Sequence, residues 1–161
     1  MGTPQFSVSI LETLAKSSYQ ISCVYTQPPK KSNRGQKLNP SPIQKSAESL
    51  KLSIRNPNNL NTDEELKFFE EINPDIVVVV AYGKLITKRF LDVPKKGFIN
   101  IHASLLPKWR GAAPIQRAIM NLDKQTGVSI MKITEELDSG PVMKKIKIDI
   151  NPSDTSGIIL E

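Results

Sequence analysis

Short apolar runs in the middle of the chain predict buried strands. Residues 75–81 consist of one Asp followed by an unbroken run of Ile, Val and Ala, and residues 97–102 are mostly apolar. A continuous run is typical of a parallel strand that helices cover on both faces. Further strands are predicted at residues 21–25, 52–54 and 127–133.

Helices are predicted where apolar residues recur at helical spacing behind a start signal. A Thr-Pro pair at residues 3–4 precedes Phe6, Ile10 and Leu14, whose four-residue spacing makes one apolar face. We therefore expect a helix from about residue 4 to 16 with Thr3 as its cap. Ser-Pro and capping-box signals and apolar spacing predict three more helices, at residues 41–50, 62–72 and 114–122.

The last part of the chain alternates between apolar and polar residues. Ile146, Ile148 and Ile150 lie on one face of residues 142–150 and charged residues on the other, which predicts a half-exposed edge strand. Because strands and helices alternate before it, the expected fold is α/β: a Rossmann-like, mostly parallel twisted sheet with flanking helices.

Composition narrows the class of protein. With 161 residues, of which 39% are hydrophobic, the chain can bury one core, so we expect a single domain over residues 1–161. No apolar stretch could span a bilayer and no signal peptide is recognisable, so we expect a cytoplasmic monomer with no membrane partner. The one Cys, one His and scattered carboxylates offer no ligand cluster, so no metal is expected.

Three polar residues are candidates for chemistry. Asn100 and His102 end a predicted parallel strand, alternate onto one face, and lie where α/β sheets bind ligands. The imidazole can exchange a proton and the amide can donate a hydrogen bond to a developing negative charge, so the pair suits acyl transfer. Asp138, in a turn, would orient His102 if the two meet. A structural His and a plain Asx-turn are the open alternatives.

Two loops are candidates for ligand binding. The loop from Ser104 to Pro114 is apolar with one Trp and two cations, and could wall a cleft for a flat heterocycle; leucines that cap the core are the alternative. Residues 30–45 contain five cations and no acid, which suits phosphate contacts, although a solvated loop explains them equally. The five are Lys30, Lys31, Arg34, Lys37 and Lys45.

Two segments resemble a known family. The segment Ile99 to Pro107, with Leu137 to Gly140 downstream, is similar to the signature of enzymes that use 10-formyltetrahydrofolate as formyl donor. The resemblance implies the formyltransferase fold, no metal, and this folate as cosubstrate. It assigns the catalytic residues Asn100, His102 and Asp138 and a folate site formed by Ser104, Leu105, Leu106, Pro107, Tyr82 and Gly83.

Further segments resemble the branch of that family that acts on methionyl-tRNA. They are residues 2–4, 25–28, 34–35, 80–83 and 108–116. The branch implies formyl transfer to the α-amino group of methionyl-tRNA in translation initiation. In that branch the basic loop approaches the tRNA acceptor stem, which assigns tRNA contacts to Lys30, Lys31, Arg34 and Lys37.

The chain also departs from the family pattern. The family has a strand before the Gly-Thr-Pro turn, a catalytic domain that continues past Glu161, and a separate C-terminal tRNA-binding domain. We therefore expect a catalytic-domain fragment that lacks its first strand. Residues 135–141 resemble the branch that acts on glycinamide ribonucleotide. The alternatives are formyl transfer to that acceptor or to an amino-sugar nucleotide, a non-catalytic RNA-binding module, and an inactive fragment.

Overall fold

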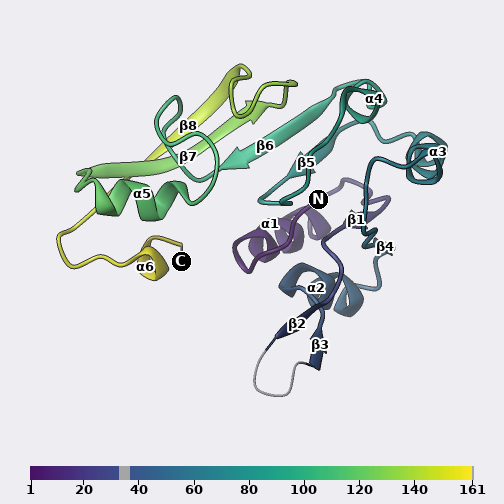
Figure 1. Cartoon of the computed structure of the whole chain (residues 1–161), viewed down its shortest axis with the longest axis horizontal. Helices are drawn as coiled ribbons and strands as arrows, with labels where there is room; N and C mark the ends of the chain where they lie inside the picture. Colours follow the sequence, from purple (N-terminus) through teal and green to yellow (C-terminus); the bar gives the residue numbers. More distant parts are fainter. Residues whose placement is uncertain (33–36, 161) are drawn as a thin grey trace.

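The computed structural model describes residues 1–32 and 37–160 of the chain (Figure 1). Its helices are α1 (Phe6–Ala15), α2 (Pro42–Ser49), α3 (Asp63–Ile72), α4 (Lys88–Leu91), α5 (Pro114–Met120) and α6 (Ser156–Leu160). Its strands are β1 (Val24–Tyr25), β2 (Lys30–Ser32), β3 (Lys37–Asn39), β4 (Ile54–Arg55), β5 (Val77–Val79), β6 (Phe98–His102), β7 (Gln125–Lys132) and β8 (Val142–Asp149). The predicted alternation of strands and helices is confirmed.

The described strands form one four-stranded sheet, of order β5-β6-β7-β8, and two two-stranded sheets, β1-β4 and β2-β3. Strand β5 pairs with β6 in parallel, and β1 pairs with β4 in parallel. Strands β7 and β8 continue the sheet beyond β6 in antiparallel order. The α/β class is confirmed, and the antiparallel part carries the chain from the end of β6 back along the same sheet (Figure 1).

Met1 and Gly2 join the two parallel pairs. The backbone N–H of Gly2 donates to the carbonyl of Tyr25 in β1, at 2.9 Å, and Gly2 forms a parallel bridge with Val80 after β5. The N–H of Val80 donates to the carbonyl of Met1, also at 2.9 Å. Met1 and Gly2 therefore lie between β1 and β5.

An aromatic core holds β5 and β6 against the helices. Phe69 of α3 packs against Phe90 of α4 at 5.4 Å between ring centroids and against Phe98 of β6 at 5.9 Å. All three rings are buried. This cluster fixes the start of β6, and therefore the place where its carboxyl end emerges.

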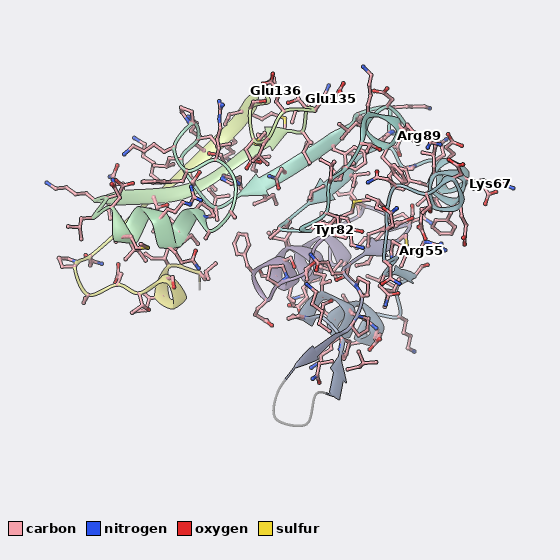
Figure 2. The ribbon with its side chains drawn as sticks, viewed as in Figure 1. Arg55, Lys67, Tyr82, Arg89, Glu135 and Glu136 are labelled. Atoms are coloured by element: carbon pink, nitrogen blue, oxygen red, sulfur yellow. The ribbon has the colours of Figure 1, made fainter. Side chains whose placement is uncertain are left out.

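A buried ion pair links β4 to α3. Glu65 of α3 accepts two hydrogen bonds from the guanidinium of Arg55, at 2.9 and 2.5 Å, and one from the hydroxyl of Tyr25, at 3.1 Å. The predicted cap is confirmed, since Thr62 accepts from the N–H of Glu65. The carboxylate of Glu65 therefore links α3 to Arg55 of β4 (Figure 2).

The first helix differs from its prediction. It begins at Phe6 without a side-chain cap, because the hydroxyl of Thr3 donates to the carbonyl of Tyr82, at 3.0 Å. Its buried residues are Ser7 and Leu11, whereas the predicted apolar face is only half-buried. Leu11 packs with the apolar cluster of β1 and α2, which turns the helix about one residue from the predicted face.

Two peripheral segments complete the structure. The basic loop contains the hairpin of β2 and β3, which projects from the body of the molecule (Figure 1). Strand β8 is confirmed as an edge strand, but all eight of its residues are exposed rather than half-buried, because no other described element covers its apolar face. Within residues 1–32 and 37–160, no helix is long and apolar enough to cross a membrane.

Candidate active site

His102 lies at the carboxyl end of β6 and is held on both sides of its ring. Its side chain is 8% exposed. Its Nε2 is 2.9 Å from the carbonyl oxygen of Trp109, and because a carbonyl only accepts, Nε2 is the donor. Its Nδ1 lies 3.5 Å from Oδ2 of Asp138. The ring therefore faces an oxygen acceptor on each side.

Asp138 connects the candidate residues. It stands in the turn between β7 and β8 with a left-handed backbone (φ 45°). Its Oδ2 accepts from the N–H of Gly111, at 2.8 Å, and its Oδ1 accepts from Nδ2 of Asn100, at 3.3 Å. These contacts reach across to β6 and its following loop, which a plain Asx-turn would not require. The structure thus brings Asn100, His102 and Asp138 together, while their catalytic roles stay predictions.

The register of the sheet explains why these side chains meet. Asn100 and His102 are two residues apart on β6 and share a face. Ser129 lies opposite His102 on β7 and anchors the loop that follows β6: its hydroxyl donates to the carbonyl of Ser104, at 2.7 Å, and accepts from the N–H of Leu106, at 3.1 Å. The loop therefore lies over the face that carries the candidate residues.

The predicted folate residues of this loop divide into two pairs. Ser104 and Leu106 are buried, and the Ser104 hydroxyl donates to the carbonyl of Lys108, at 2.6 Å. Leu105 is half-buried and Pro107 is exposed. The first pair therefore shapes the loop, and the second pair presents apolar surface.

Tyr82 and Gly83 follow β5, the strand beside β6 (Figure 2). The carbonyl of Tyr82 accepts from Nε2 of Gln27, at 3.0 Å. Gly83 has φ +75°, a left-handed conformation that side chains rarely adopt, and this conformation favours Gly. The Tyr82 ring is buried, and burial with the negative charge of Glu65 raises the pKa of its hydroxyl. Among the described contacts, these residues meet Thr3 and Gln27, not the His102 group.

Sequence reasoning missed the backbone groups of the loop from Lys108 to Gly111. The carbonyl of Trp109 holds His102, and the N–H of Gly111 holds Asp138. Backbone groups have no signature of their own in a sequence. The left-handed conformations of Trp109 and Gly111 bring them to the site, and only the Gly gave a hint of this.

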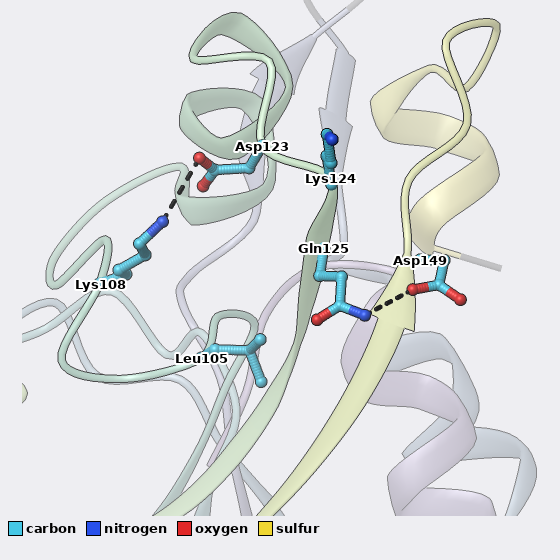
Figure 3. Close-up of a pocket in the computed structure, with 6 residues that line it drawn as sticks. All are labelled: Leu105, Lys108, Asp123, Lys124, Gln125 and Asp149. Carbon is cyan, nitrogen blue, oxygen red and sulfur yellow. Dashed lines mark hydrogen bonds and ion pairs between the residues drawn. The ribbon is translucent and has the colours of Figure 1, made fainter.

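A pocket lies on another side of this loop (Figure 3). It has a volume of about 770 Å3 and is lined by Leu105, Lys108, Asp123, Lys124, Gln125 and Asp149. None of the three candidate catalytic residues lines it. No group of three or more His, Cys, Asp or Glu that could hold a metal ion occurs in residues 1–32 and 37–160.

The predicted tRNA residues lie on or near the projecting hairpin. Lys30 is exposed on β2. Lys31 and Lys37 belong to β2 and β3, but the placement of their side chains is not described, and Arg34 lies outside the described residues. Burial, and to a smaller extent the positive charge of Lys30, lowers the pKa of the Lys84 amine.

Known proteins resemble the chain over its whole length. A family model described as formyl transferase matches residues 1–161. The methionyl-tRNA formyltransferase of Pelagibacter ubique is 58% identical over 160 residues, which cover 99% of this chain and 52% of that protein. The methionyl-tRNA formyltransferase of Roseobacter denitrificans is 51% identical over 156 residues, covering 97% and 51%. The chain therefore spans about half the length of the curated relatives it matches.

A solved structure shows the same fold. The phosphoribosylglycinamide formyltransferase from Streptococcus pneumoniae TIGR4 superimposes with a TM-score of 0.78 at 19% identity, over 99% of this chain and 85% of that one. This likeness confirms the predicted fold class.

Proposed function

The chain belongs to the formyl transferase family, and from that premise we propose that it transfers a formyl group from 10-formyltetrahydrofolate to the α-amino group of methionyl-tRNA. The observation that carries this proposal is the meeting of Asn100, His102 and Asp138 at the end of β6. An amide donor, an imidazole and a carboxylate in contact are suited to acyl transfer.

Asn100 and His102 would stabilise the charge that develops on the formyl oxygen. Attack by the amine on the formyl carbon places negative charge on that oxygen. The amide of Asn100 has two hydrogens, and only one is used by Asp138. The 3.5 Å between Nδ1 of His102 and Asp138 is longer than an ordinary hydrogen bond, so Nδ1 remains available to a substrate oxygen.

Proton transfer would also pass through His102. The new C–N bond forms at the α-amine, the C–N bond to the folate nitrogen breaks, and one proton must move from the first nitrogen to the second. His102 is the only imidazole of the chain. Asp138 would orient its ring, which is a role of a carboxylate beside a catalytic His.

The folate would supply an activated formyl group, and the loop after β6 suits a flat heterocycle. Leu105 and Pro107 present apolar surface next to the strand end that carries His102. Ser104 and Leu106 would contribute by fixing the shape of the loop, since both are buried. We propose Gly83, with the backbone of Tyr82, as a second wall, because the carboxyl ends of β5 and β6 lie side by side.

The acceptor is inferred from the relatives. Both curated relatives described above are named methionyl-tRNA formyltransferases. The projecting basic hairpin supports an RNA acceptor, because phosphate contacts need accessible cations. We propose that Lys30, Lys31, Arg34 and Lys37 approach the acceptor stem, and that the protein acts as a cytoplasmic monomer in translation initiation.

The test is an acceptor competition with the protein expressed from its natural gene. Methionyl-tRNA, glycinamide ribonucleotide and an amino-sugar nucleotide are offered with 10-formyltetrahydrofolate, and kcat/KM is measured for each. His102→Ala or Asn100→Ala should lower kcat by roughly 10²–10³-fold. Asn151→Ala, which changes an exposed amide beyond β8, is the matched control and should keep wild-type turnover.

Each other outcome has a clear meaning. Preference for one of the small acceptors would overturn the methionyl-tRNA assignment but not the chemistry. Near-normal turnover of His102→Ala would overturn the mechanism. Salt-sensitive tRNA binding that survives His102→Ala, without any formyl transfer by the wild type, would instead support an RNA-binding module.

A further inference from the structure

Asp123 lies between α5 and β7, outside the candidate site. Both oxygens of its carboxylate have partners. Its side chain is 9% exposed. Oδ2 accepts from the indole N–H of Trp109, at 2.8 Å. Oδ1 accepts from the side-chain amide of Asn121, at 2.8 Å, and lies 3.5 Å from Nζ of Lys108. Two of these three donors belong to the loop that follows β6.

Trp109 joins Asp123 to the candidate site. Its indole donates to Asp123, while its own carbonyl accepts from Nε2 of His102. Its backbone has φ 58°, the left-handed region that a bulky residue adopts only when surrounding contacts hold it there. Two residues later the N–H of Gly111 donates to Asp138. One short segment therefore holds both His102 and Asp138.

We propose that Asp123 is a positioning residue for this site: by binding the Trp109 indole and the Lys108 amine, it holds the loop so that the Trp109 carbonyl meets His102 and the Gly111 N–H meets Asp138. Asp123 does not contact the reacting groups in this arrangement. Asp123 acts on the site by binding the Trp109 indole, and the Trp109 backbone in turn contacts His102. The catalytic part of this proposal rests on the proposed function, whereas the positional part does not.

The charge of Asp123 fits this role. Hydrogen bonds from Asn121 and Trp109 lower the pKa of its carboxyl group, so it is ionised at neutral pH. Hydrogen bonds to a carboxylate are stronger than those to a neutral acceptor. The same group also lines the pocket of Figure 3, where Asp149 is a second carboxylate, bound by Gln125 at 2.7 Å. Asp149 therefore serves as a matched control.

The experiment compares Asp123→Asn, Trp109→Phe, the double variant and Asp149→Asn in the protein expressed from its natural gene. Trp109→Phe removes the indole N–H but keeps the backbone carbonyl. We expect each single variant to lower kcat by roughly 10- to 100-fold with little change in KM, since small misplacements of catalytic groups have effects of this size. The double variant should be no worse than the poorer single variant, because both changes remove the same contact.

A second readout does not depend on activity. His102 and Trp109 are the only His and Trp of these 161 residues. Their ring N–H signals can be assigned by nitrogen-15 NMR with His102→Gln and Trp109→Phe. In Asp123→Asn and in Trp109→Phe, the Nε2 hydrogen of His102 should exchange with water about tenfold faster than in the wild type. Asp149→Asn should leave both the exchange rate and kcat unchanged.

These readouts separate the two proposals. Unchanged exchange at His102 in both Asp123→Asn and Trp109→Phe would overturn the positioning role, even if Asp123→Asn lost activity. Equal effects of Asp149→Asn would overturn it too, and would indicate that the pocket itself matters. If Asp123→Asn does not fold, the exchange rate of His102 in Trp109→Phe still tests the positioning role. If the wild type transfers no formyl group, the proposed function fails while the exchange measurement still tests the position of the loop.

Discussion

Replacing Asp138 with Asn removes one negative charge from the candidate site while keeping the size of the side chain. Asp138 accepts from Gly111 at 2.8 Å and from Asn100 at 3.3 Å, and faces His102 at 3.5 Å. Its side chain is 12% exposed, so water replaces these partners poorly. An amide has one oxygen and one NH2 group, so at least one of the three neighbours would face a donor instead of an acceptor.

The expected loss of activity follows from the number of partners that Asp138 holds. In the less costly orientation of the introduced amide, its oxygen faces Gly111 and His102 and its NH2 group faces Asn100. Asn100 then loses its hydrogen bond to the carboxylate, and His102 loses the negative charge that faces it. A hydrogen bond to a charged group contributes about 1.5–3 kcal/mol. If that contribution is realised in the transition state, Asp138→Asn should lower kcat by roughly 10- to 150-fold.

Single-turnover formylation at saturating donor, together with thermal unfolding, measures the two consequences separately. We expect a lower rate and a small loss of stability, with Asp149→Asn unchanged in rate. The reasoning would be refuted if folded Asp138→Asn kept a rate within about twofold of the wild type, because the carboxylate would then serve only the packing of its turn.

Two further predictions concern stability. Glu65→Gln should lower the free energy of unfolding by about 3 kcal/mol in urea, because it leaves the Arg55 guanidinium without its charged partner in a largely buried pair. Asp63→Asn, which removes an exposed ion pair from the same helix, should cost less than about 1 kcal/mol, and equal losses would contradict this account. The lowered pKa of Asp123, below its ordinary 3.8, means that its stabilisation is present above that pH and is lost as the pH falls through the folded-state pKa. The stability difference between wild type and Asp123→Asn should therefore shrink below pH 3.8, and a constant difference would refute this.

The sequence predicted the elements that are determined by residues close together in the chain. The helices α2 and α3 were predicted correctly because Ser41 and Thr62 supply their own caps. The buried strands β5 and β6 were predicted because an uninterrupted apolar run has few alternatives. The cap and the face of α1 were not, because Thr3 bonds the distant Tyr82 and Leu11 packs against β1 and α2.

The arrangement around the candidate site was also predicted only in part. Alternation on one strand predicted that Asn100 and His102 share a face, and the structure has this arrangement. The exposed state of β8 was not predicted, since alternation shows which residues are apolar but not whether another element covers them.

The sequence by itself determined the α/β class, the residue types of the candidate site and the resemblance to a family. Only the tertiary structure decided that Asp138 meets His102 across 36 positions of chain, and that Trp109 and Gly111 hold the two with backbone groups. The physical reason is that every residue except proline carries the same backbone N–H and C=O. Which of them reaches a given side chain is set by the path of the loop, and at this site Asp123 and the left-handed turns fix that path.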